Sequence, residues 1–327
     1  MDGKRIGICY DTKEDYGFEK DNLLFTDFVS LQIVSDIQSA LEDNGYDVVF
    51  CGHLTRLIDF VEREEQAIDL VFNIAEGHKS RNRVALVPAY LEAKKIKHTG
   101  SDAFAMTLLQ NKHFTKILLR NIGIDVPKGF VFKELNLHTT LEANDIGYPL
   151  IIKPNSEGGS MGIKLVKNKD EFISASQDLI NEYNCELLCE KYIAGKEITV
   201  PIIGNGDESI ALGVAAIVKE DGSDIDLYDA YMKHYCKAKS TFEFECDESV
   251  VERIKQTSLL IHSYFDIHDY SRMDFRLDSN GNFYFLEANL LPFLSRYGSF
   301  EVCAKNMNKS YNEIINWIVD CAFKRYK

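Results

Sequence analysis

The sequence predicts an α/β protein in which an N-terminal parallel sheet is followed by further strands and helices. Short apolar segments alternate with helical segments through the first hundred residues, as expected for a parallel sheet. A glycine-rich turn follows a strand-like run near residue 155, and Asn280-Gly281 separates two alternating, aromatic-rich runs. With 327 residues, 45% of them apolar, the chain is long enough for two or three domains.

The first hundred residues are expected to form six elements. In chain order these are a strand over 4–9, a helix over 27–44, a strand over 46–51, a helix over 54–66, a strand over 68–74 and a helix over 82–94. The turn after the first strand reads YDTKEDYGFEKDN and lacks G-x-G-x-x-G, the phosphate-binding sequence of dinucleotide-binding folds. A Rossmann-type dehydrogenase is therefore disfavoured.

The rest of the chain is expected to contain strands in pairs, with helices between them. The expected elements are a helical pair over 101–123, strands over 148–153 and 163–166, a helix over 169–183, a strand over 187–193, a mixed stretch over 221–247, a hairpin over 270–289 and a helix over 311–324. The apolar run 210–218 is too short to cross a bilayer and indicates a buried strand.

The charge balance narrows the classes of partner. Acidic residues (51) outnumber Lys plus Arg (37), giving a net charge of −14. This argues against a broad nucleic-acid or anionic-membrane surface, because both need a basic face, but it allows a small phosphate ligand in a local basic pocket. The N-terminus MDGKRIGICYD lacks the apolar core of a signal peptide, and the eight cysteines need not form disulfides in a chain of this length. We therefore expect a cytoplasmic protein.

A glycine-rich segment, PLIIKPNSEGGSMG at 149–162, is a candidate phosphate-binding flap. Its glycines allow the backbone N–H groups to approach an anion, and Ser160 adds a hydroxyl. Lys153 precedes the glycines and a strand follows them, so the segment is a flap between antiparallel strands and not a Walker loop. Lys112 is a second candidate phosphate ligand. The alternatives are a simple hairpin turn and a solvated lysine.

The hairpin YSRMDFRLDSNGNFYFLEAN predicts a metal site. If the two residues of the Asn-Gly turn form the loop, Asp274 faces Glu287 and Arg272 faces Asn289. Directly opposed Cβ atoms lie about 4.5–5.5 Å apart, and two carboxylates at that distance repel unless a cation lies between them. With Asn289 they supply the oxygen ligands that Mg²⁺ prefers. The alternative is a solvated sheet face on which Arg272 pairs with Asp274.

At this point the sequence resembles the ATP-grasp ligases, most of all the D-alanine-D-alanine ligase family. The resemblance covers nearly the whole chain and rests on HTGSD at 98–102, the Lys112 helix, PLIIKPNSEGGSMG, LLCEKYIAGKEITV at 187–200 and SRMDFRLDSNGNFYFLEANLLP at 271–292. It implies an ATP-grasp fold preceded by an N-terminal parallel-sheet (pre-ATP-grasp) domain. The implied domains are 1–101, 102–188 (central, small) and 189–327 (C-terminal, catalytic).

The resemblance also implies residue roles and a reaction. Lys112, Lys153 and Ser160 would bind the phosphates of ATP, Glu190, Lys191 and the backbone near Ile193 its adenine, and Glu197 its ribose. Asp274, Glu287 and Asn289 would bind Mg²⁺ or Mn²⁺. Lys233 and Arg272 would lie at the reacting centre. A substrate carboxylate would attack the γ-phosphorus of ATP, and an amine would then attack the acyl phosphate. The implied partners are small amino-acid substrates, without nucleic acid or membrane, in a family that is commonly dimeric.

The substrate end departs from the family pattern. The first strand-to-helix turn is longer than the family's, and the usual proline-glycine pair after Asn289 is Pro292-Phe293. The candidate substrate contacts are Glu76, His78, Arg83, His234 and Arg296, each of which could equally be a surface charge or a local ion pair. We therefore expect a ligase with different amino-acid substrates. The alternatives are a true D-alanine-D-alanine ligase with variant contacts and an ATP-binding regulatory module without catalysis.

Overall fold

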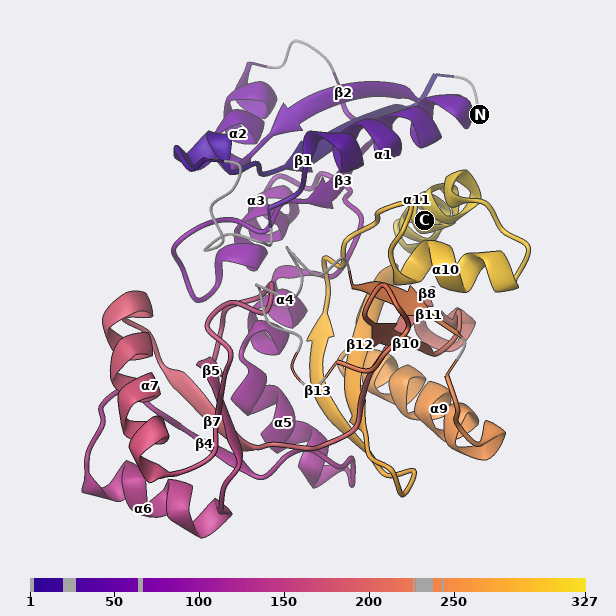
Figure 1. Cartoon of the computed structure of the whole chain (residues 1–327). Coiled ribbons are helices and arrows are strands. Elements are labelled where there is room, and N and C mark those ends of the chain that lie inside the picture. Colours follow the sequence, from indigo (N-terminus) through magenta and orange to yellow (C-terminus); the bar gives the residue numbers. More distant parts are fainter. Residues whose placement is uncertain (1–2, 20–27, 64–66, 226, 228–237, 243) are drawn as a thin grey trace.

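A computed structural model describes residues 3–19, 28–63, 67–225, 227, 238–242 and 244–327, and the chain is arranged around three sheets (Figure 1). The N-terminal sheet lies at the top of the view, a four-stranded sheet lies at the lower left and a six-stranded sheet at the lower right. The mixed α/β class expected from the sequence is confirmed.

The N-terminal sheet is parallel, as predicted, with strand order β2-β1-β3. Its elements are β1 (Arg5–Tyr10), η1 (Glu14–Tyr16), α1 (Leu31–Asp43), β2 (Asp47–Gly52), α2 (Leu54–Glu62), β3 (Leu70–Ile74), η3 (Arg83–Ala85) and α3 (Leu86–Ala93). The single helix expected over 82–94 is wrong, because a 3₁₀ turn precedes α3. Pro88 falls in the first turn of α3, where a helix does not need the missing N–H.

The four-stranded sheet carries the glycine-rich flap. Its order is β4-β7-β5-β6, and the flap joins the antiparallel strands β5 and β6, as predicted. Its elements are β4 (Gly129–Phe132), α6 (Leu137–Ile146), β5 (Leu150–Pro154), β6 (Lys164–Val166), α7 (Lys169–Tyr183) and β7 (Leu187–Lys191). Both helices pack against one apolar core with the strands. Because β7 pairs with β4 and β5, this sheet continues past the domain boundary expected at 188.

The six-stranded sheet has the order β11-β10-β8-β12-β13, and β9 pairs with β8. Its strands are β8 (Lys196–Ile203), β9 (Ile210–Ala211), β10 (Ala215–Val218), β11 (Lys239–Thr241), β12 (Tyr270–Leu277) and β13 (Phe283–Asn289). The continuous strand expected over 210–218 is wrong, because β9 and β10 pair with β8 in different registers. Pro201 of β8 lies opposite the segment between β9 and β10, and a proline has no N–H to donate to that segment.

Helices on both sides of the six-stranded sheet connect it to the rest of the chain. They are α4 (Ala103–Gln110), α5 (Lys112–Asn121), α9 (Glu248–Tyr264), α10 (Ser299–Asn306) and α11 (Tyr311–Arg325), with η4 (Gly206–Glu208) between β8 and β9. The sequence interpretation did not identify α9 or α10. One apolar core contains residues of the N-terminal sheet, α10 and α11, so the C-terminal helices pack against that sheet. No helix within the described ranges is long and apolar enough to cross a membrane.

The hairpin of β12 and β13 differs from the predicted one at its turn. The loop has three residues, 279–281, since Asp278 pairs with Asn282, and the expected two-residue loop is therefore wrong. A bulge at Leu286 then shifts the register by one residue. The two differences cancel at the far end of the hairpin. The facing pairs there are those predicted, Asp274 with Glu287 and Arg272 with Asn289.

Candidate active site

Two connected cavities lie where the four-stranded and six-stranded sheets face each other. A narrow cavity of about 80 Å³ is lined by β5, β7 and the segment after it, together with β8, β12 and β13. A second cavity of about 290 Å³ is lined by the flap, the six-stranded sheet and the loop 291–299. Ser160, Glu197, Asp274 and Glu287 line both cavities. These cavities contain most of the described residues that the sequence singled out.

A buried cluster of lysines and glutamates forms one wall. Lys153 of β5 and Lys116 of α5 both contact the carboxylate of Glu190, with Lys153 Nζ 3.0 Å from Glu190 Oε2. All three are more than nine-tenths buried. Lys112 donates to the carbonyl oxygen of Glu157 in the flap, and its Nζ lies 3.3 Å from Glu287 Oε2. Lys153 therefore reaches the wall of the narrow cavity, and Lys112 reaches the wall of a small cavity that Glu287 also lines.

Burial and neighbouring charges displace several pKa values in this cluster. Burial lowers the pKa of Lys116 to about 8, against the opposing effect of Glu190. Burial tends to lower the pKa of Lys153, but the Glu190 and Glu287 carboxylates outweigh it and raise that pKa. Burial tends to raise the pKa of Glu190, and the two lysines outweigh it in turn. Near neutral pH Lys153 is a cation and Glu190 an anion, and most of Lys116 is charged.

The carboxylates of the hairpin lie at the floor of both cavities. Asp274 accepts hydrogen bonds from the Arg272 guanidinium (2.9 and 2.7 Å), the Asn289 amide (2.7 Å) and the Thr199 hydroxyl (2.7 Å). The Arg272–Asp274 pairing that was the alternative interpretation of this face is thus present. Burial tends to raise the pKa of Glu287, but the neighbouring cations outweigh it and hold that pKa at about 2.

The residues at this floor fit a divalent cation. Asp274 and Glu287 face each other directly across the hairpin, and the Asn289 amide contacts Asp274. The three side chains together offer the hard oxygen donors that Mg²⁺ prefers. Glu287 is ionised across the range in which enzymes work. Within the described ranges, no group of three His, Cys, Asp or Glu side chains could hold a metal by itself. A cation here would therefore need the Asn289 oxygen or a ligand from the substrate.

The segment after β7 forms the narrow end of the first cavity. The Lys191 side chain donates to the carbonyl oxygens of Gly147 and Tyr148 (2.9 and 3.1 Å), and the Ile193 carbonyl accepts from Arg276 (3.0 Å). Glu197 lies 3.7 Å from Arg276. Burial raises the pKa of Glu197 to about 7, opposed by Arg276 and reinforced by the nearby Asp274 and Glu287.

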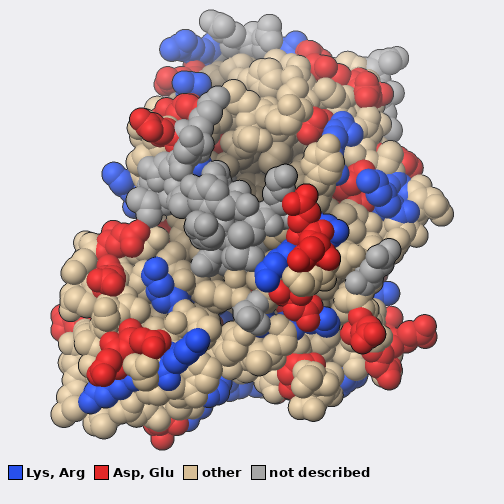
Figure 2. All heavy atoms as spheres, in the orientation of Figure 1, with Lys and Arg blue, Asp and Glu red and all other residues tan. Residues whose placement is uncertain are grey.

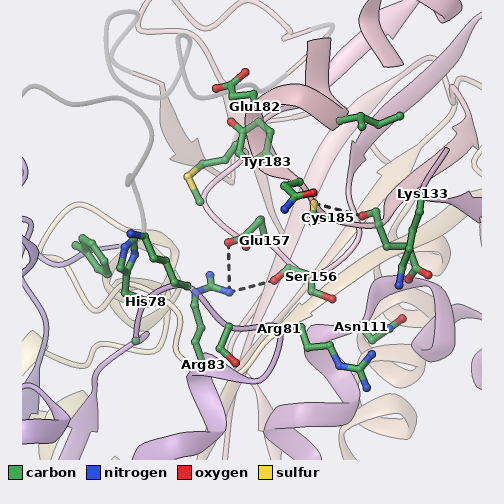
Figure 3. Close-up of a pocket in the computed structure, with 18 residues that line it drawn as sticks. His78, Arg81, Arg83, Asn111, Lys133, Ser156, Glu157, Glu182, Tyr183 and Cys185 are labelled. Atoms are coloured by element: carbon green, nitrogen blue, oxygen red, sulfur yellow. Dashed lines mark hydrogen bonds and ion pairs between the residues drawn. The ribbon is translucent and has the colours of Figure 1, made fainter. Parts of the chain in front are cut away.

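The predicted substrate residues are distributed differently. Glu76, at the end of β3, lines the larger cavity and also a small one with Lys112 and Glu287. His78 and Arg83 line a separate cleft of about 760 Å³ on the other side of the flap base (Figure 3). Arg296 pairs with Asp36 of α1 (3.1 Å) and does not line these cavities. The predicted contacts Lys233 and His234 lie outside the described residues.

The described residues that the sequence interpretation did not single out include Lys116, Thr199 and Arg276, which contact the carboxylates of the site. Lys116 lies four residues after Lys112, a spacing that places both on one face of α5 and could have indicated it. Thr199 and Arg276 reach the site from β8 and β12, whose pairing register the sequence did not supply.

On the face shown in Figure 2, acidic and basic side chains are interspersed over the surface.

Comparisons with known proteins agree on one family. The family model described as "D-ala D-ala ligase C-terminus" matches residues 118–320. The D-alanine–D-alanine ligase of Aquifex aeolicus is 29% identical over 77% of this chain and 81% of its own length. The structure of the Bacillus anthracis D-alanine–D-alanine ligase complexed with ATP superposes with a TM-score of 0.76 at 23% identity, over 98% of both chains. The VanG D-Ala:D-Ser ligase of Enterococcus faecalis superposes with a TM-score of 0.78 at 20% identity, over 98% of this chain and 99% of its own.

Proposed function

The chain belongs to the D-Ala-D-Ala ligase family and is an ATP-grasp ligase that forms a C–N bond, and from this premise we propose its reaction: it joins two amino acids, or an amino acid and an amine, through an acyl phosphate. The observation that carries the proposal is the convergence of Lys112 and Lys153 with the Arg272, Asp274 and Glu287 side chains around connected cavities. Positive charge for phosphates and oxygen donors for a cation thus lie together.

ATP is proposed to lie with its base in the narrow cavity and its phosphates toward the larger one. The narrow cavity has apolar walls, among them Ile151, Ile163 and Leu286, which suit a planar base. Glu197 at the junction of the two cavities can accept from ribose hydroxyls. Lys153 lines the narrow cavity and Lys112 lines the small cavity that Glu287 also lines, so both can approach phosphates that extend toward the larger cavity. The ATP complex of the Bacillus anthracis ligase supports the same use of this fold.

Asp274, Glu287 and Asn289 are proposed to hold Mg²⁺, or Mn²⁺, beside the phosphates. When bound, the cation would neutralise charge on the transferring phosphoryl group. The protein's own contribution is to position the substrates and to supply charge. Lys112 and Lys153 offset the phosphate charge, and the flap with Ser160 excludes water above them.

The reaction then follows in two steps. A carboxylate oxygen of the first substrate attacks the γ-phosphorus, the bond to the β-phosphate oxygen breaks, and ADP leaves. The amine nitrogen of the second substrate attacks the acyl carbon, loses a proton, and inorganic phosphate departs with the former carboxylate oxygen. Arg272 lines the larger cavity, and its paired hydrogen bonds to Asp274 fix its orientation, so it can stabilise the oxyanion that forms between these events.

The substrates are proposed to differ from D-alanine. The larger cavity is bordered by the bulky Phe293 and Tyr297 side chains and by the Glu76 carboxylate. Phe293 narrows and Glu76 charges the space in which the two amino acids would meet, and Tyr297, 88% exposed, lies at its open edge. The side chains around this cavity therefore limit which amino acids can bind there.

The proposal is tested by measuring phosphate release from MgATP with pairs of D- and L-amino acids and detecting products by mass. We expect one or more pairs to stimulate release and to give a product one water lighter than their sum. The control is Asp274→Asn, which should show no stimulation. Turnover with D-alanine alone would identify a true D-alanine-D-alanine ligase. ATP binding without stimulation by any pair would instead indicate a regulatory module and refute the ligase reaction.

A further inference from the structure

Arg83 is buried at the contact between the N-terminal domain and the base of the flap. Its side chain is 5% exposed although it is charged. Its Nη1 donates to the carbonyl oxygen of Ser156 (3.0 Å) and lies 3.4 Å from Glu157 Oε2. Figure 3 shows both contacts as dashed lines from Arg83, the first residue of η3, to Ser156 and Glu157 at the flap base. A buried guanidinium is costly unless it is paired, so these contacts fix the two segments together.

The same guanidinium faces the substrate side. Arg83 Nη2 lies 3.8 Å from Glu76 Oε2, and Glu76 lines the larger catalytic cavity. The loop between them is held tightly, because Gly77 has a φ of +70° and a Cβ at that position would press on the Arg83 carbonyl oxygen. The Gly77 N–H also donates to the buried Asp11 carboxylate (2.7 Å). The separation of Glu76 and Arg83 is therefore set by the backbone.

The flap base is held from the catalytic side as well. Gln110 donates to the Ser156 carbonyl oxygen (2.6 Å), the same atom that Arg83 contacts. Lys112 donates to the Glu157 carbonyl oxygen and contacts Glu287 of the proposed metal site. Two residues further along, Gly159 and Ser160 form part of the cavity wall. Any shift of the flap base is therefore transmitted to the position of the flap over the phosphates.

We propose that Arg83 is a positioning residue that ties the ATP flap to the substrate-facing loop of the N-terminal domain. It sets the height of the flap through Ser156 and Glu157, and it orients Glu76 toward the amino-acid cavity. This role differs from the substrate-carboxylate contact expected from the sequence. It rests on the proposed function in that the flap covers ATP. The consequence is that nucleotide binding and amino-acid binding are coupled through one guanidinium.

The test compares Arg83→Gln with Arg81→Gln, a matched control because Arg81 is an exposed arginine of the same loop. The readouts are the Kd of MgATP measured by calorimetry without amino acid, and amide hydrogen exchange over residues 156–162. We expect Arg83→Gln to raise the Kd of MgATP about tenfold, because one charge-assisted hydrogen bond is lost. The same variant should speed amide exchange in the flap but not in β12. Arg81→Gln should leave both readouts unchanged.

Two further variants separate positioning from folding. Arg83→Lys retains the positive charge but lacks the several N–H donors of the planar guanidinium. It should therefore bind MgATP more tightly than Arg83→Gln but less tightly than the unmodified protein. Glu157→Gln keeps Arg83 in place and removes the negative charge of its ion-pair partner, and should raise the Kd by a smaller factor, about threefold. In an active enzyme Arg83→Gln should raise the KM for ATP far more than it lowers kcat. A purely structural role would instead speed exchange in β12 together with the flap.

An unchanged MgATP Kd and unchanged flap exchange in Arg83→Gln would overturn the proposal. So would equal effects of Arg83→Gln and Arg81→Gln. Because these readouts need no amino-acid substrate, they still report if no pair of amino acids supports turnover. Failure of the ligase reaction and failure of the flap tie are therefore distinguishable.

Discussion

Glu197 and Glu287 line the same cavities, but their pKa values lie on opposite sides of the ordinary value of 4.5. Burial raises the pKa of Glu197 to about 7; Arg276 opposes this rise and the nearby Asp274 and Glu287 carboxylates reinforce it. Burial acts on Glu287 as well, but surrounding lysines and Arg272 bring its pKa to about 2. Replacing each glutamate by the neutral, isosteric glutamine should therefore change stability in opposite directions.

The magnitude follows from linkage between protonation and folding. Each pKa lies about 2.5 from its ordinary value, and one pH unit corresponds to about 1.4 kcal/mol, so the full effect is about 3.4 kcal/mol. The side chains of Glu197 and Glu287 are 20% and 27% exposed, and solvent screening reduces both effects to about 2 kcal/mol. At pH 8 and without ligand, Glu197→Gln should raise the free energy of unfolding by that amount, and Glu287→Gln should lower it.

The pH dependence distinguishes the two residues further. A raised carboxyl pKa disfavours the ionised folded form, so the penalty from Glu197 develops above pH 4.5 and is complete above pH 7. A depressed pKa stabilises the fold above pH 4.5, and that stability is lost as the pH falls toward 2. At pH 5 the effect of Glu197→Gln should fall to about a quarter of its value at pH 8, whereas that of Glu287→Gln remains nearly full.

The assay is urea unfolding of the ligand-free protein at pH 8 and pH 5, followed by tryptophan fluorescence, with the exposed Glu134→Gln as control. The control should leave the free energy of unfolding unchanged at both values of pH. Equal signs for the two cavity variants, or a pH-independent effect of Glu197→Gln, would refute the electrostatic reasoning.

Two other outcomes are expected. Asp274→Asn should abolish amino-acid-stimulated phosphate release while the circular dichroism spectrum stays unchanged, because the amide is a weaker ligand for a hard cation. Gly195→Ala should lower the free energy of unfolding by about 3 kcal/mol or more, since φ is +136° and a Cβ would overlap the Leu277 carbonyl oxygen. Its control, Gly206→Ala, has φ of +52° and open space around it, and should cost about 1 kcal/mol in urea unfolding.

The facing pairs of the hairpin could be predicted, but for an incomplete reason. The Asn-Gly signal locates a turn without deciding whether two or three residues form the loop. Here the Asp278 carboxylate accepts from the N–H groups of Asn280 and Asn282, which favours the longer loop. The bulge at Leu286 shifts the alternation by one residue, so that Phe283 and Phe285 are followed on the apolar core by Ala288. The prediction of Asp274 opposite Glu287 is confirmed because the two differences compensate.

The two halves of the site differ in how far the sequence determines them. Apart from Lys112 on α5, the residues expected at the nucleotide lie on or beside strands or in the glycine-rich turn, where local periodicity and pairing fix which way a strand side chain points. The environment of Arg83 depends on Ser156, 73 residues away in the sequence, and local pattern contains no information about that contact. The sequence does not distinguish a loop arginine that binds a substrate carboxylate from one that donates to a carbonyl oxygen of its own chain. The burial of Arg83 and the exposure of Arg81, two residues apart, are decided by tertiary packing alone.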